Sequence, residues 1–178
     1  MKPPSTIRVC LALLAVAASG ILAASATATS GSEASLPTLS HEVLNAVNTF
    51  RAAHGLGRLR ESRALDRAAR AHSLEMGRVG YFGHSSADGT AFWRRIRHFY
   101  GARNRPYWSV GENLLWSSPS VSAAGAMTMW IASPEHLRNM LTPKWRDIGV
   151  SAVRVVDAPG VFGGRRVTII TADFGDRH

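Results

Sequence analysis

Two histidines and one glutamate have the types and the local setting for metal binding or proton transfer. His84 follows a glycine in an expected loop, Glu112 stands between a glycine and an asparagine, and His136 lies two residues after a Ser-Pro pair. Imidazole and carboxylate groups are ligands for a divalent metal, and they also serve as general acids and bases. We therefore take His84, Glu112 and His136 as candidate metal ligands and candidate catalytic residues. We predict that the fold brings them to one cleft.

Each of the three also has a structural interpretation. A loop histidine such as His84 can be a ligand, a base or only a polar surface group. His136 is expected in the first turn of a helix, where the helix dipole disfavours its protonated form and favours a neutral ring. The alternative is a ring bound to a backbone carbonyl. Glu112 fits a buried hydrogen-bond anchor and a ligand equally well.

Nearby polar residues fit less specific roles. His72 falls on an apolar helical stripe, which indicates a core histidine bound to backbone. Asn113 is interpreted as a structural hydrogen-bonding residue of its loop. Ser85 and Ser86 stand beside His84, but no nucleophile-elbow motif and no orienting acid accompany them. The pattern therefore does not favour a serine hydrolase.

Helices are expected in the first two thirds of the chain, and strands at its end. Apolar residues recur at helical spacing after Ser or Thr residues that suit a helix start. The five predicted helices begin near Ser40, Ser62, Thr90, Ser120 and Ser133, and the first two end at Gly55 and near Gly80. Alternating and β-branched residues predict strands over 148–156 and 167–174. The fold class is α+β, with a small antiparallel sheet covered by helices.

The first residues have the layout of a secretory signal peptide. A basic start precedes the uncharged apolar run 9–22, and small residues follow it. That run is shorter than the roughly 20 residues of a membrane span, so no transmembrane anchor is expected after cleavage. We predict a signal peptide over 1–28, a flexible lead-in over 29–38 and one domain over 39–176. The only cysteine, Cys10, falls in the first segment, so the secreted or extracytoplasmic domain has no thiol chemistry.

The charge balance indicates an anionic partner. The 178 residues carry 21 Lys and Arg against 12 Asp and Glu, a net charge of +9. An exported cationic domain is attracted to anionic lipid or to an anionic envelope polymer. Nucleic acid is not expected, because export opposes it and no recognition motif is present. The alternative explanation is a set of solvated, arginine-rich helix faces.

Seven segments, in this order and spacing, resemble a bacterial member of the CAP superfamily (cysteine-rich secretory proteins, antigen 5, pathogenesis-related 1), also called the SCP-like extracellular domain. They are Val47-Asn48-Thr49-Phe50-Arg51, Ala71-His72-Ser73, Tyr81-Phe82-Gly83-His84-Ser85, Gly111-Glu112-Asn113-Leu114-Leu115-Trp116, Ser133-Pro134-Glu135-His136-Leu137-Arg138-Asn139, Asp147-Ile148-Gly149-Val150 and Asp173-Phe174-Gly175. The resemblance runs from about Leu39 to Gly175. It implies an α-β-α sandwich with helices on both sides of an antiparallel sheet.

The resemblance also implies a large cleft able to hold a divalent cation. Many eukaryotic members carry two histidines and two glutamates there, and His84, Glu112 and His136 match three of these places. Ser133 stands where the fourth, a glutamate, is found. Three protein ligands leave an open coordination position, as in catalytic zinc sites, and the smaller negative charge disfavours calcium. Zinc is therefore the expected cation.

Three functions follow as hypotheses. The first is a secreted binding module of the cell envelope whose His/Glu cleft holds a divalent metal. The second is a metal-dependent hydrolase of peptide or envelope polymer bonds. The third is a non-catalytic structural or stress-related scaffold. Members of the superfamily are credited with different activities, so the fold does not decide whether this chain is an enzyme.

Overall fold

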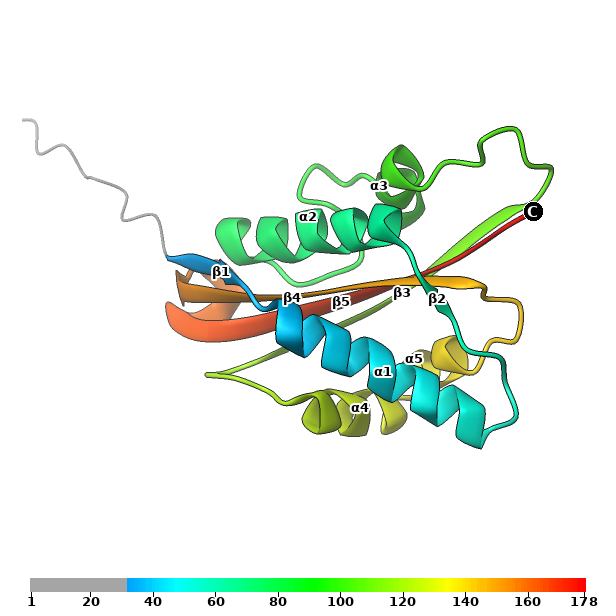
Figure 1. Ribbon diagram of the computed structural model, residues 1–178. Helices are drawn as coiled ribbons and strands as arrows, with labels where there is room; N and C mark the ends of the chain where they lie inside the picture. The colour runs from blue at the N-terminus through cyan, green and yellow to red at the C-terminus, as the bar shows by residue number, and fades with distance from the viewer. Residues whose placement is uncertain (1–31) are drawn as a thin grey trace, which may run out of the picture.

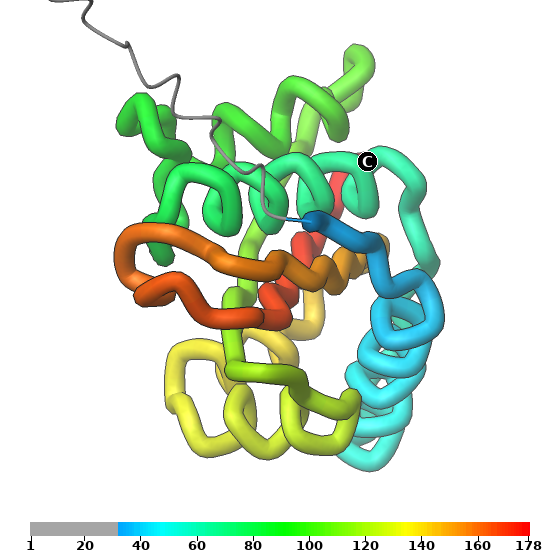
Figure 2. Tube along the Cα trace, turned by 90° about the vertical axis from the view of Figure 1, so that its left-hand side faces the viewer, coloured from blue at the N-terminus to red at the C-terminus, as the bar shows by residue number. Residues whose placement is uncertain are grey.

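A computed structural model describes residues 32–178, which form three layers. A central sheet has α2 (Arg63–Val79) and α3 (Phe92–Phe99) on one face, and α1 (Pro37–Ala53), α4 (Ala123–Ile131) and α5 (Pro134–Met140) on the other (Figures 1 and 2). This is the predicted α-β-α sandwich. The predicted signal peptide, residues 1–28, lies outside the described residues. None of the helices within 32–178 is both long enough and apolar enough to cross a membrane.

All five predicted helices and both predicted strands are present in the predicted order, and three strands that were not predicted lie before or between the helices. The helices are α1 (Pro37–Ala53), α2 (Arg63–Val79), α3 (Phe92–Phe99), α4 (Ala123–Ile131) and α5 (Pro134–Met140). The strands are β1 (Glu33–Ser35), β2 (Arg60–Glu61), β3 (Trp108–Ser117), β4 (Asp147–Ala158) and β5 (Arg165–Arg177), with a 3-10 turn, η1 (Gly160–Phe162), between the last two.

The sheet places β3 at an edge. The strand order is β1-β4-β5-β3, all antiparallel, and the two-residue β2 lies parallel to β4. β3 pairs with β5 along its length, from Trp108 opposite Arg177 to Ser117 opposite Thr168. Its other side has no strand among the described residues, so loops and short helices can approach it there.

Successive side chains of the strands point to opposite faces of the sheet and pack in the hydrophobic core on each face. Leu114 and Ile169 pack in the core under α2, whereas Leu115 and Ile170 pack in the core under α1 and α4. Because successive residues of a strand point to opposite faces, Glu112 belongs to the α2 and α3 face. Asn113 belongs to the face covered by α5. Glu112 and Asn113, which are neighbours in the sequence, therefore contact different helices.

The start of the first helix and the predicted lead-in also differ from the sequence prediction. The first helix begins at Pro37, three residues before the predicted Ser40, because proline suits a first helical position. Part of the 29–38 segment that was predicted to be flexible is ordered as β1. Its residues 33–35 pair with 153–155 of β4, and Glu33 forms a bidentate ion pair with Arg78 of α2.

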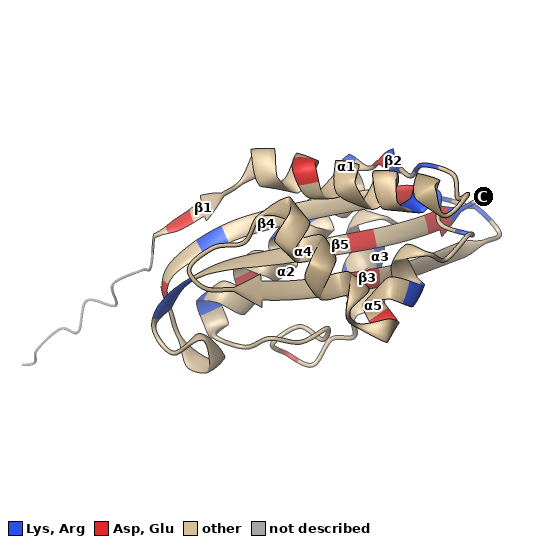
Figure 3. Ribbon diagram, turned by 90° about the horizontal axis from the view of Figure 1, so that it is seen from below, with Lys and Arg blue, Asp and Glu red and all other residues tan. Residues whose placement is uncertain are grey.

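Basic and acidic residues are interspersed on the face seen in Figure 3. Ribbon segments coloured blue or red for these residues occur in several elements, including α1, α5, β4 and β5. Glu42 of α1 and Glu135 of α5 are exposed, which supports the interpretation of solvated helix faces there.

Candidate functional site

A cavity of about 350 Å³ lies at the free edge of β3 and contains all three candidate residues in its wall. His84 comes from the loop between α2 and α3, Glu112 from β3 and His136 from α5. The cavity is completed by Phe92, Gly111, Asn113, Glu135 and Asn139. Residues that are 52 positions apart in the sequence, from His84 to His136, thus border one space.

Asn113 attaches α5 to the strand edge. Its Nδ2 donates to the carbonyl oxygen of His136 at 3.1 Å, and its Oδ1 accepts from Asn139 Nδ2 at 2.9 Å. The adjacent Gly111 permits this close packing, since a Cβ there would lie 2.6 Å from Asn139 Oδ1. The structural role predicted for Asn113 is therefore observed, and it fixes the position of His136.

The carboxylate of Glu112 is buried and fully engaged. Oε1 lies 2.8 Å from His84 Nδ1, and Oε2 forms an ion pair with the guanidinium of Arg95 on α3. Arg95 also donates to the backbone oxygen of His84 at 2.9 Å. Glu112 and Arg95 together therefore hold the histidine loop in place. This arrangement corresponds to the anchor interpretation of Glu112.

The contact with Glu112 fixes the proton on His84. A carboxylate only accepts hydrogen bonds, so His84 Nδ1 must be the protonated nitrogen. The other ring nitrogen, Nε2, has no hydrogen-bond partner among the described residues. Metal-binding histidines commonly donate the second nitrogen to a carboxylate in this way, and so do histidines that act as bases.

His136 favours its neutral form. Burial lowers the pKa of its imidazole, and the nearby His84 lowers this pKa further, while Glu135 opposes the shift. The hydrogen bond to Asn113 uses the backbone oxygen of His136 and not its ring. Its ring therefore has no hydrogen-bond partner within residues 32–178, and a neutral imidazole faces the cavity.

The metal-site prediction remains a prediction. Among the described residues, no three His, Cys, Asp or Glu side chains are placed close enough together to hold one ion. Glu112 and His136 approach the cavity from opposite faces of β3, and both Glu112 oxygens are already bonded. Ser133, in the place of the fourth ligand, is the N-cap of α5. However, Glu135 follows two residues later and brings an exposed carboxylate to the cavity wall.

Two buried titratable residues, Asp173 and His72, lie next to residues of the site. Asp173 is the cross-strand neighbour of Glu112, and neither of its carboxylate oxygens has a partner in the described part of the chain. Burial, followed by the charge of Glu112, raises the pKa of Asp173 well above its ordinary value. His72 is a core residue, as predicted, and its Nε2 lies 2.9 Å from the carbonyl oxygen of Gly83, next to His84.

The sequence analysis did not identify Arg95 or Asp173 as members of this site. Arg95 stands in the run Arg94-Arg95-Ile96-Arg97, where nothing distinguishes the buried arginine from its exposed neighbours. Only the helical position, on the side of α3 that faces the strand, separates them. Asp173 could have been noticed as a charged residue inside a strand of apolar pattern.

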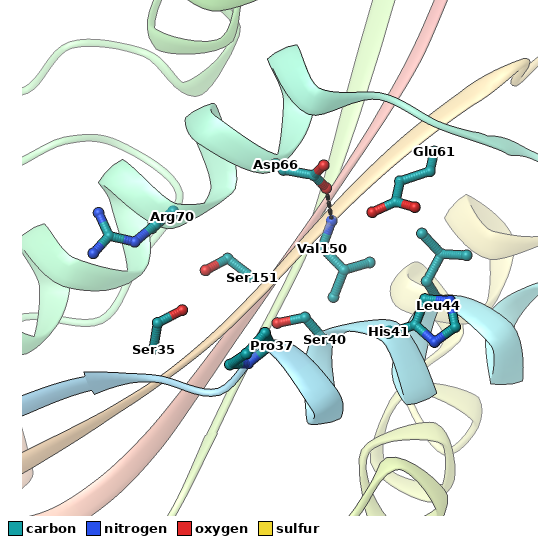
Figure 4. Close-up of a pocket in the computed structure, with 10 residues that line it drawn as sticks. All are labelled: Ser35, Pro37, Ser40, His41, Leu44, Glu61, Asp66, Arg70, Val150 and Ser151. Atoms are coloured by element: carbon teal, nitrogen blue, oxygen red, sulfur yellow. Dashed lines mark hydrogen bonds between the residues drawn. The ribbon is translucent and has the colours of Figure 1, made fainter.

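A second cavity, of about 200 Å³, lies between α1, α2 and β4 (Figure 4). Here side chains from the helices bind backbone of β4 in the gap between β1 and β2. Asp66 Oδ1 accepts from Val150 N at 3.0 Å, and Ser40 Oγ accepts from Ala152 N at 2.8 Å. Burial raises the pKa of Asp66 from 3.8 to about 6. These contacts give Asp66 and Ser40 a structural role, because their side chains accept hydrogen bonds from backbone amides of β4 in this gap.

The variant Asp66→Asn is expected to become more stable relative to the original chain as pH rises. The folded pKa of about 6 exceeds the ordinary value of 3.8, so this carboxyl group contributes stability at low pH that is lost as pH rises through 6. Asparagine keeps the acceptor for Val150 and cannot ionise. Thermal unfolding at pH 4, 5, 6 and 7.5 checks this. A difference in melting temperature that is constant over this range would contradict it.

Comparisons with known proteins agree with this architecture. A profile of the cysteine-rich secretory protein (CAP) family matches residues 44–162. A search of curated proteins found no match. An outer surface protein from Borrelia burgdorferi superposes with a TM-score of 0.67 at 17% identity, covering 83% of this chain and 99% of that one.

Two longer bacterial proteins contain the same fold. An extracellular protein with an SCP domain from Bacillus anthracis gives a TM-score of 0.61 at 22% identity, and 80% of this chain aligns with 41% of that one. A cysteine-rich secretory protein from Staphylococcus aureus gives 0.56 at 16% identity, with 79% and 39% coverage. This chain thus spans about two fifths of their length, and at such identities the likeness concerns the fold alone. The profile match over residues 44–162 shows that the chain belongs to the cysteine-rich secretory protein (CAP) family.

Proposed function

We propose that this chain is an exported binding module whose β3-edge cavity takes up a divalent cation through His84 and His136. The observation that carries the proposal is the contact between His84 Nδ1 and the buried Glu112, which leaves Nε2 of a ring in the cavity wall available. The lowered pKa of His136 supplies a second neutral imidazole. In this proposal Glu112 orients His84, and the direct-ligand role suggested for it by the sequence remains a prediction.

The donor set suits zinc better than calcium. Zinc binds imidazole nitrogen readily, whereas calcium takes six to eight oxygen ligands. The cavity presents two imidazoles and the exposed carboxylate of Glu135, since Glu112 is occupied by His84 and Arg95. Two imidazoles as the protein ligands leave open positions for water or for a ligand from outside. We expect zinc to be the preferred cation.

The predicted export and the net charge of +9 support an anionic envelope component as the partner. The hydrolase alternative uses the same cavity and the same cation. It adds that the cation would activate a water molecule, and that Glu112 or a histidine not bound to the cation would accept a proton from that water. Evidence against metal uptake through His84 would therefore remove both hypotheses together.

Calorimetric titration of the purified protein with Zn²⁺ tests the proposal. His84→Ala and His136→Ala are each expected to weaken zinc binding by at least about 100-fold, more than the 10–100-fold typical of losing an outer partner. His54→Ala is the matched control, because this exposed ring bonds only to the Phe50 carbonyl oxygen at the end of α1. Zinc binding should also fall between pH 7.5 and pH 5, as protons compete for the rings.

Two results of the zinc titration would contradict binding in this cavity. If the original chain and His84→Ala take up zinc with the same affinity, the cavity is not the binding site. If His54→Ala weakens zinc binding as much as His136→Ala does, the binding belongs to scattered surface histidines.

A further inference from the structure

A third cavity, also of about 350 Å³, lies where α1 and α4 begin. Its wall contains residues 35–39 from the junction of β1 and α1, residues 120–122 before α4, and Glu42, Arg154 and Thr168. It shares no lining residue with the cavity of His84 and His136. Nothing in the proposed metal site uses these groups, so their chemistry needs its own explanation.

Arg154 and Thr168 supply hydrogen-bond donors that the described chain does not use. They are direct cross-strand neighbours in β4 and β5, on the face covered by α1 and α4. Arg154 is half-buried, and no ion pair or hydrogen bond joins its guanidinium to another residue within 32–178. Thr168 is 1% exposed, and its hydroxyl is also without a partner there. A buried hydroxyl of this kind normally has a partner.

Two helix N-termini meet at the same wall. α1 has 17 residues and α4 has 9, and each carries partial positive charge at its start. The backbone amides of Thr38 and Leu39 have no acceptor among the described residues, and the α1 cap residue makes no side-chain cap bond. At α4, the Ser122 hydroxyl accepts from Gly125 N at 3.1 Å. Free amides at a helix start form a common anion site.

Glu42 is the one carboxylate in this wall. It lies on α1, is exposed, and makes no ion pair with Arg154. Its negative charge reduces the attraction of the cavity for an anion without occupying the arginine. Removal of this charge should therefore strengthen anion binding, whereas removal of the Arg154 charge should weaken it.

We propose that this third cavity binds a phosphate group, either free or as part of a phosphodiester. A phosphate presents several acceptor oxygens in different directions, and it matches a guanidinium fork, a hydroxyl donor and free helix amides at once. The inference concerns a different cavity from the proposed metal site. Because its ligand and its variants differ, either proposal can fail while the other stands.

Titration of the purified protein with inorganic phosphate at low ionic strength, followed by amide NMR, tests the inference. We expect saturable shifts at Thr38, Leu39 and Thr168. Arg154→Gln should weaken phosphate binding about tenfold or more, as for the loss of a charged hydrogen bond. Glu42→Gln should strengthen it by about twofold or more, since a like charge is removed. Arg58→Gln, an exposed arginine outside the cavity, is the matched control.

Thr168→Val separates binding from folding. Valine has nearly the same shape and removes a buried hydroxyl without a partner, so the variant should be at least as stable as the original chain. Phosphate affinity should nevertheless fall. Unchanged phosphate affinity in both Thr168→Val and Arg154→Gln would overturn the inference, as would equal losses in Arg154→Gln and Arg58→Gln.

Vesicles distinguish the sources of the phosphate. Phosphatidylglycerol vesicles that bind the original chain, but bind Arg154→Gln more weakly, would assign the site to a lipid headgroup. Phosphate binding that depends on Arg154, combined with vesicle binding that does not, would assign it to free phosphate or a phosphodiester polymer. Vesicle binding alone, insensitive to Arg154 and without saturable phosphate binding, would overturn the inference.

Discussion

Replacement of Glu112 by alanine is expected to lower the free energy of unfolding by about 3–5 kcal/mol, even in the absence of any metal. The Glu112 and Arg95 side chains are 1% and 8% exposed, so the substitution leaves a buried guanidinium without its counter-ion. His84 also loses the acceptor of its Nδ1 proton. Urea unfolding of the two proteins in the presence of a chelator measures this loss.

Variants of the neighbouring residues separate the causes. In an Arg95→Met background, Glu112→Ala should cost much less, because no buried charge is left unpaired. Asp173 is the group that can compensate, since the charge of Glu112 contributes to its raised pKa. Combining Glu112→Ala with Asp173→Asn should therefore cost more than Glu112→Ala alone. An unchanged urea midpoint for Glu112→Ala would contradict the anchor role and remove the main support for the scaffold hypothesis.

This result also separates two roles for the carboxylate. A residue that only binds metal contributes stability when metal is present and none when it is absent. An anchor contributes in both conditions. The contacts of both Glu112 oxygens with protein groups predict the second behaviour.

The regular elements could be predicted from the sequence because their signals are local. Helical spacing between a capping residue and a glycine defined α2, whose limits Ser62 and Gly80 are the observed cap residues. β-branched residues defined β5. β1 and β2 have three and two residues, and they exist only through pairing with β4. A strand so short carries no periodicity of its own, so the sequence alone could not indicate it.

The three candidate residues of the site could be predicted from the sequence, but the role of each could not. The motifs of His84, Glu112 and His136 pointed to one cleft, and the three residues border one cavity. Which atoms remain available depends on partners distant in sequence. Arg95 forms an ion pair with one carboxylate oxygen of Glu112. Successive residues of a strand point to opposite faces, so Glu112 and Asn113 lie on different faces of the sheet. Those facts follow from strand register and helix rotation, which local patterns do not fix.

Gly149 is a position where one added methyl group should have a large effect. It lies in β4 opposite Asp173, where α2 begins to cross the sheet. A Cβ on Gly149 would stand 2.2 Å from the backbone nitrogen of Asp66 and 2.2 Å from the carbonyl carbon of Leu65. Backbone cannot rotate away as a side chain can, so α2 must move off the sheet. Gly149→Ala is expected to lower the free energy of unfolding by about 3 kcal/mol, at the upper end for overpacking.

The displacement should also reach the cavity at β3. α2 carries His72, whose ring bonds to the Gly83 carbonyl oxygen beside His84. Gly149→Ala should therefore weaken zinc binding as well as stability, although the residue is not in the cavity wall. Gly57→Ala is the control, because a Cβ there meets no atom within 4 Å. Urea midpoints that fall equally in the two variants would show that the close approach of α2 to β4 is not the cause. A lower midpoint for Gly149→Ala alone, together with weaker zinc uptake, would show that contact between this helix and strand maintains the loop of His84.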